Sequence, residues 1–107
     1  MMLKKLYDLL NGFDRRQKRI ESRIECLLAD ERHGLSFKQQ EDIRSYYLAG
    51  EHFLAFEFFV DALVEAEREV DPAVLTKCEI LLSEYSAKDG QRVRQALNYL
   101  MKSDGLR

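Results

Sequence analysis

The chain has 107 residues, of which 46% are hydrophobic and 34% charged, and its formal net charge is −2. This balance is typical of one globular domain and excludes a disordered or strongly basic protein. No uncharged apolar run approaches the ~20 residues of a membrane helix. One proline and five glycines favour long helices. We therefore expect residues 1–107 to form a single all-α domain, a bundle of five to six helices.

The first two expected helices lie within residues 3–31. A short amphipathic helix over 3–10 is expected to end at Asn11 and Gly12, a turn signal. Its apolar positions are Leu3, Leu6, Tyr7 and Leu10. A second helix should begin at the capping residue Asp14 and run to about Glu31. Its apolar stripe consists of Ile20, Ile24, Leu27 and Leu28. Residues 1–10 lack the apolar h-region of a secretory signal peptide, so we expect a cytoplasmic protein.

A third helix is expected from Ser36 to about Gly50, after a break at His33 and Gly34. Ser36 and Gln39 have the spacing of a capping box. The apolar face of this helix consists of Ile43, Tyr46 and Tyr47.

The fourth helix, about 51–69, is expected to be the central hydrophobic helix. Its core side consists of Phe53, Phe56, Val60, Leu63 and Val64. Glu57, Asp61 and Glu65 recur at a spacing of four and form an acidic seam. Leu54 and Phe58 fall beside this seam. Arg68 lies near the same azimuth and is expected to relieve the repulsion between the carboxylates.

Two further helices complete the expected bundle. Asp71 followed by Pro72 is a helix-start signal, because Asp caps and Pro fits the first helical position. The apolar positions of this fifth helix are Val74, Cys78, Leu81, Leu82 and Tyr85. The sixth helix, about 90–102, carries Val93, Leu97, Leu100 and Met101 at helical spacing.

No pattern of chemical groups predicts catalysis, a metal or a cofactor. Cys26 and Cys78 lack CxxC spacing, so we expect both to be buried small hydrophobes. His33 and His52 have no second ligand at zinc spacing. Three acids on successive turns do not by themselves make an acid–base pair. We expect a protein that is not an enzyme and that has no catalytic residues, metal or cofactor.

Two segments are candidates for binding a partner. The acidic seam with Leu54 and Phe58 is either a packed helix edge with solvated carboxylates or a surface for a basic protein. Residues 15–23 are rich in arginine and lysine within a basic end: residues 1–23 carry +4, residues 24–84 carry −9 and residues 85–107 carry +3. That basic run is a solvated face, a phosphate-binding segment or a contact with the acidic middle.

Residues 43–85 resemble the MafI-type immunity proteins of polymorphic toxin systems. The residues that carry the resemblance are Ile43-Arg44, Leu48-Ala49-Gly50-Glu51, Leu54-Ala55-Phe56-Glu57 and Asp61-Ala62-Leu63-Val64-Glu65. Phe58, Phe59 and Val60 depart from the pattern, where a Cys or small aliphatic residue is common, and Ala62 replaces a frequent Gln.

The resemblance implies an immunity protein that binds one cognate toxin domain, often a nuclease, and blocks its active site. Such toxins include those of contact-dependent growth inhibition. The candidate partner-binding residues are Glu57, Phe58, Asp61, Glu65 and Leu54. The alternative function is a helical adaptor or regulator that contacts nucleic acid through residues 15–23.

Overall fold

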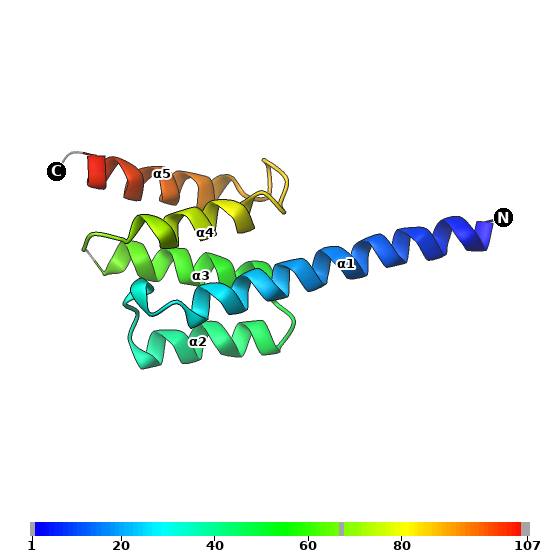
Figure 1. The fold of residues 1–107 in the computed structure, drawn as a ribbon, viewed down its shortest axis with the longest axis horizontal. Helices are drawn as coiled ribbons and strands as arrows, with labels where there is room; N and C mark the ends of the chain where they lie inside the picture. Colours follow the sequence, from blue (N-terminus) through cyan, green and yellow to red (C-terminus); the bar gives the residue numbers. More distant parts are fainter. Residues whose placement is uncertain (1, 67, 106–107) are drawn as a thin grey trace.

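The protein folds into helices alone over the residues that its computed structural model describes, which are 2–66 and 68–105 (Figure 1). Within these ranges there are five α-helices, one 3₁₀ helix and no strand. In chain order they are α1 (Met2–Ala29), η1 (Glu31–His33), α2 (Phe37–Leu48), α3 (His52–Glu65), α4 (Pro72–Leu82) and α5 (Gln91–Gly105). The expected all-α class is confirmed. None of these helices is long and apolar enough to cross a membrane.

The first two expected helices are in fact one continuous helix, α1, so the predicted break at Asn11 and Gly12 is wrong. Gly12 does not adopt a left-handed backbone conformation. A glycine inside a helix destabilises it by only about 1 kcal/mol relative to alanine. The backbone hydrogen bonds of a long helix outweigh this cost. Asp14 consequently lies inside α1 and pairs with Lys18 one turn later, at 3.4 Å.

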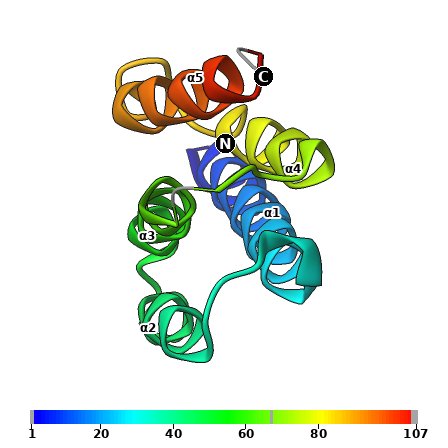
Figure 2. The same ribbon diagram turned by 90° about the vertical axis from the view of Figure 1, so that its left-hand side faces the viewer.

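The other helices lie beside the second half of α1 (Figure 1), and Figure 2 shows the bundle end-on. The α1 helix packs against α3 and α4, α5 packs against the same two helices, and α2 packs against α3. The first half of α1 extends past this bundle and gives the molecule a length of 58 Å against 27 and 19 Å in the other directions (Figure 1).

The α3 helix supplies much of the core, as its sequence predicts. Its buried residues are Ala55, Phe56, Phe59, Val60, Ala62 and Leu63. The other two expected core residues, Phe53 and Val64, are half-buried and pack against the core. The helix ends at Glu65 rather than at residue 69, because the following turn must bury Val70 and place Asp71 at the start of α4.

Local capping signals fix the starts of α2 and α4. Ser36 and Gln39 form the predicted capping box, and the Asp71 carboxylate accepts a hydrogen bond from the Ala73 N–H at 2.8 Å. The expected fifth helix ends at Leu82, earlier than Tyr85. Cys78 is buried as expected, and burial raises the pKa of its thiol to about 12. Cys26 is exposed, which corrects the prediction, because the packed stripe of α1 passes along another side of the helix.

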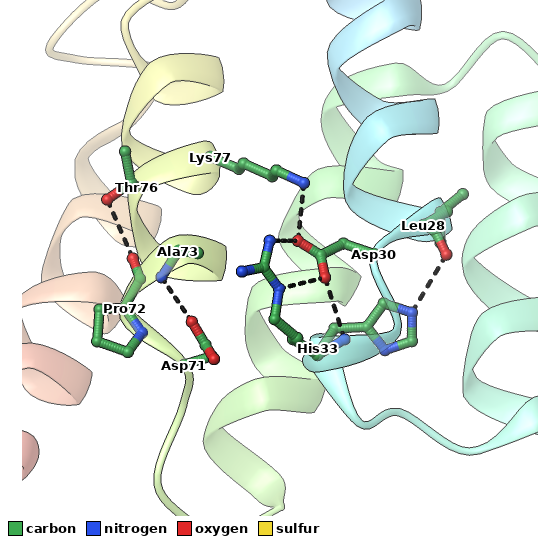
Figure 3. Close-up of polar contacts among 9 residues, drawn as sticks. Leu28, Asp30, His33, Asp71, Pro72, Ala73, Thr76 and Lys77 are labelled. Atoms are coloured by element: carbon green, nitrogen blue, oxygen red, sulfur yellow. Dashed lines mark hydrogen bonds and ion pairs between the residues drawn. The ribbon is translucent and has the colours of Figure 1, made fainter.

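The junction after α1 is tied to α4 by the buried carboxylate of Asp30 (Figure 3). Asp30 accepts hydrogen bonds from the Arg32 side chain at 2.8 Å and from Lys77 Nζ at 2.7 Å. It also accepts from the Arg32 N–H and so caps η1. The Arg32 and Lys77 hydrogen bonds hold the pKa of Asp30 far below its usual range. Asp30 therefore stays charged while it fixes the turn that leads into α2.

Candidate partner-binding groove

The α2 and α3 helices form a hairpin whose outer side is hollowed. The turn between them is tight: Gly50 has a φ of 82°, and the Glu51 N–H donates to the Tyr46 carbonyl at 2.9 Å. A left-handed φ of this kind favours glycine, which has no Cβ to clash. The two helices therefore run antiparallel, and the start of α2 faces the end of α3.

The hollow between these two helices, here called the α2–α3 groove, has a volume of about 200 Å³. It is lined by Gln39, Asp42 and Ile43 from α2 and by Phe58, Asp61, Ala62 and Glu65 from α3. Three of the five residues predicted for partner binding, Phe58, Asp61 and Glu65, thus meet in one place. Leu54 and Glu57 do not line the groove.

An aromatic pair forms part of the groove wall. The Phe58 ring stacks on the Tyr46 ring with centroids 4.7 Å apart and an interplanar angle of 10°. Phe58 remains 39% exposed, although it lies on the most hydrophobic helix of the protein. The stack holds one face of Phe58, so the exposed part of the ring is a fixed apolar surface beside the carboxylates.

The acidic seam of α3 is partly neutralised from α5. Arg92 donates through Nη1 to Glu57 at 2.6 Å and through Nη2 to Asp61 at 2.7 Å. These contacts with Glu57 and Asp61 raise the pKa of the Arg92 guanidinium. The cation that relieves the seam is therefore Arg92 and not Arg68, which instead donates to the Gly34 carbonyl. Glu57 is engaged within the molecule, which fits its position outside the groove.

Two other groove acids keep their charge uncompensated. Asp42 and Glu65 are exposed, and neither side chain forms an ion pair with any other residue in the described ranges. Asp42 comes from α2 and Glu65 from α3. Asp61 also lines the groove, but it pairs with Arg92. The groove therefore presents negative charge on both of its walls and the Phe58 ring in its α3 wall.

Sequence reasoning missed the contribution of α2 to this site. Gln39, Asp42 and Tyr46 follow one another at i, i+3 and i+7, which places them on one face of α2. That spacing could have predicted Asp42 beside Tyr46. It could not have predicted that this face meets the acidic seam, because the pairing depends on how the hairpin closes.

The basic run 15–23 is largely committed within the molecule. Arg16 donates through Nε and Nη2 to the Glu84 carbonyl, at 3.0 and 2.5 Å. Arg19 binds the Glu84 carboxylate through two hydrogen bonds of 3.1 Å, and Arg23 lies 3.6 Å from it. Of the three roles considered for this basic run, these contacts match a contact with the acidic middle of the chain. Arg15 is exposed, as is Lys18 in its pair with Asp14.

This cluster leads to a pH-dependence prediction for Glu84→Gln. The hydrogen bonds from Arg19 and the nearby arginines lower the pKa of Glu84. Because the folded pKa lies below the unfolded value of about 4.3, the cluster stabilises the fold above that pH and loses its contribution as the pH falls through the folded pKa. We expect Glu84→Gln to cost about 1 kcal/mol at pH 7, since Arg19 is half exposed and screened by solvent.

Urea denaturation of both proteins at pH 7 and near pH 3 measures this effect. The difference in unfolding free energy between the natural protein and Glu84→Gln should shrink as the pH falls. A difference that stays constant would show that the Glu84 charge does not contribute.

The described residues hold no group of three or more His, Cys, Asp or Glu side chains arranged to bind a metal ion. Comparisons with family models, with curated proteins and with solved structures give no match for this chain. The α2–α3 groove is therefore the main structural indication of function.

Proposed function

We propose that this protein is an immunity protein that binds a cognate toxin domain through the α2–α3 groove and blocks its activity. The observation that supports this most is the acidic groove around a half-exposed, stacked Phe58. The MafI-type resemblance of residues 43–85 includes Asp61 and Glu65 of the groove, and it indicates the class of partner.

The groove fits a lysine or arginine side chain of the partner. The aliphatic stem would cover the exposed face of Phe58, while the charged end would reach Asp42, Asp61 or Glu65. Arg92 holds Asp61 in place before the partner arrives, which reduces the ordering cost of binding. A cation between the two acidic walls would be attracted by both, so its binding depends on both walls being intact.

A nuclease toxin is the kind of enzyme that this surface would inhibit. Enzymes that act on nucleic acid carry positive grooves, and an acidic protein that enters such a groove excludes the substrate. Charge complementarity would also speed association and make it sensitive to salt. The proposed mechanism is thus occlusion of the toxin active site, with no chemistry performed by the immunity protein.

The test uses the toxin domain that this proposal expects a neighbouring gene to encode. It compares two adjacent acids of one helix. Asp42→Lys reverses a charge that lines the groove, and Glu41→Lys reverses the neighbouring exposed charge that does not. We expect Asp42→Lys or Glu65→Lys to weaken toxin binding about ten-fold or more, and Glu41→Lys about three-fold at most. Association rates measured at two salt concentrations should lose part of their salt dependence in the groove variants.

Equal effects of Asp42→Lys and Glu41→Lys would contradict the groove as the binding site. Failure of the toxin domain to co-purify would contradict the proposed function itself. Retention on DNA or RNA at about 50 mM salt, weakened by Arg15→Ala, would favour the nucleic-acid alternative instead.

A further inference from the structure

The first half of α1 is an exposed helix with an apolar side. It extends beyond the ends of the neighbouring helices (Figure 1). Leu3, Leu6 and Leu9 are 81%, 54% and 71% exposed. Lys4 and Lys5 are exposed as well. We call residues 2–15 the arm.

The apolar side of the arm continues a stripe that is used for helix packing. Leu3 and Leu6 lie at positions a and d of a heptad that runs on through positions 10, 13 and 17. The same heptad reaches Ile20, Ile24 and Leu27, which are at most 2% exposed, at the α1 contact with α3 and α4. The stripe is therefore covered from Ile20 onward and open at Leu3 and Leu6.

A second hollow, here called the root hollow, lies where the covered half of the stripe begins. Its volume is about 400 Å³, and α1 contributes Arg16, Gln17 and Ile20 to its lining. The half-buried rings of Phe53 and Tyr85 lie in its wall, with their centroids 4.7 Å apart. The buried Tyr85 hydroxyl has no hydrogen-bond partner in the described part of the chain.

The root hollow is also acidic at its edge. Glu51 and Asp89 line it and are exposed, and the Glu51 side chain makes no capping hydrogen bond to α3. The root hollow thus offers apolar rings, an unpaired hydroxyl and two carboxylates. The tip of the arm carries the complementary groups, which are exposed leucines and two lysines.

We propose that two copies of this chain form an antiparallel dimer in which the arm of each copy packs on the arm of the other and its tip enters the other root hollow. In an antiparallel coiled coil, a positions face d positions. The register that places Leu3 at Ile20 of the other copy also places Leu6 at Gln17. At 1.5 Å per residue, the overlap from position 3 to position 20 is about 26 Å.

Two features favour this antiparallel arrangement over a parallel pair. The arm tip and the root hollow carry opposite charges, and the tip of each arm fills the root hollow of the other copy. An antiparallel two-fold places Lys4 and Lys5 near Glu51 and Asp89 of the other copy, and each contact occurs twice. A parallel pair would leave both root hollows empty. A lipid surface would attract the lysines but would not fill the root hollow.

The first experiment measures oligomeric state by sedimentation of the full chain. We expect a dimer at about 100 μM and a monomer after the double substitution Leu3→Gln and Leu6→Gln. The thermal midpoint of a dilute, monomeric sample should not change, since both leucines are exposed in the single chain. A natural chain that stays monomeric at this concentration would overturn the proposal.

Charge reversal tests the contact between tip and root hollow. Lys4→Glu with Lys5→Glu should weaken dimerisation about ten-fold or more, because like charges then meet at both ends. Adding Glu51→Lys and Asp89→Lys to the same chain should restore it. Weakening without restoration would overturn the assigned register.

Disulfide crosslinking distinguishes the two orientations. In a Cys26→Ser background, which leaves only the buried Cys78, a chain with Leu6→Cys is mixed with a chain with Gln17→Cys and oxidised with diamide. We expect the mixed pair to crosslink much faster than two Leu6→Cys chains. Faster crosslinking of two Leu6→Cys chains would indicate a parallel dimer, and monomers that float with vesicles of anionic phospholipid would indicate a membrane surface. Either result would overturn the proposal.

Discussion

Phe59→Ala is expected to lower the free energy of unfolding by about 3–5 kcal/mol, the usual cost of removing a buried aromatic ring. Phe59 is 2% exposed on α3, and its ring meets the His33 ring edge-on with centroids 5.7 Å apart. It touches the junction after α1 as well as its own helix, so the cavity would open at the centre of the bundle. Urea denaturation gives the unfolding free energy directly.

The neighbouring residue provides a matched control. Phe58→Ala removes the same side chain from the same helix, but this ring is 39% exposed and stacks only at the groove edge. We expect it to cost about 1 kcal/mol, the value of an aromatic pair. Under the proposed function, Phe58→Ala should nevertheless weaken toxin binding. Equal losses of stability in both variants would contradict the different roles assigned to Phe58 and Phe59.

The sequence predicts the helices well where periodicity and caps agree. The buried face of α3 follows from helical spacing, and Ser36 and Asp71 place two helix starts because their side chains bind backbone N–H groups nearby. The error at Gly12 has a physical cause, because a glycine signals a turn only where the backbone needs a left-handed conformation. Gly34 and Gly50 adopt one and Gly12 does not.

The candidate site could be predicted only in part, because its charges are paired over long distances in sequence. Phe58, Asp61 and Glu65 follow one another at spacings of three and four residues and are predicted from one segment. Asp42 joins them only through the closed hairpin. Arg92 reaches Asp61 across 31 residues, and no local pattern indicates such a pair.

The structure also divides the acidic middle of the chain by role. Asp30 and Glu84 bind basic side chains and fasten α1 and its following turn to the chain around α4. Glu57 is held by Arg92. Asp42 and Glu65 form no ion pair in the described ranges, and both line the α2–α3 groove.

A second large effect is expected for His33→Ala, which should cost about 2–4 kcal/mol of unfolding free energy. His33 is buried between α1 and α2, and its Nε2 lies 3.2 Å from the Leu28 carbonyl (Figure 3). Its Nδ1 accepts a hydrogen bond from the Leu35 N–H at 2.9 Å. The proton of the neutral ring therefore lies on Nε2, which donates to Leu28. Removing the ring leaves a backbone donor and a backbone acceptor without partners.

Two variants separate hydrogen bonding from packing at this position. His33→Phe keeps a ring against Phe59 but satisfies neither backbone group, so it should cost nearly as much as His33→Ala. His52→Ala is the matched control, because that histidine is less buried than His33, with 14% of its side chain exposed, and it bonds the side chain of Gln17 rather than two backbone groups. It should cost about 1 kcal/mol at most. If His33→Phe were as stable as the natural protein, ring packing rather than hydrogen bonding would hold the turn after α1, and the two bonds would contribute little.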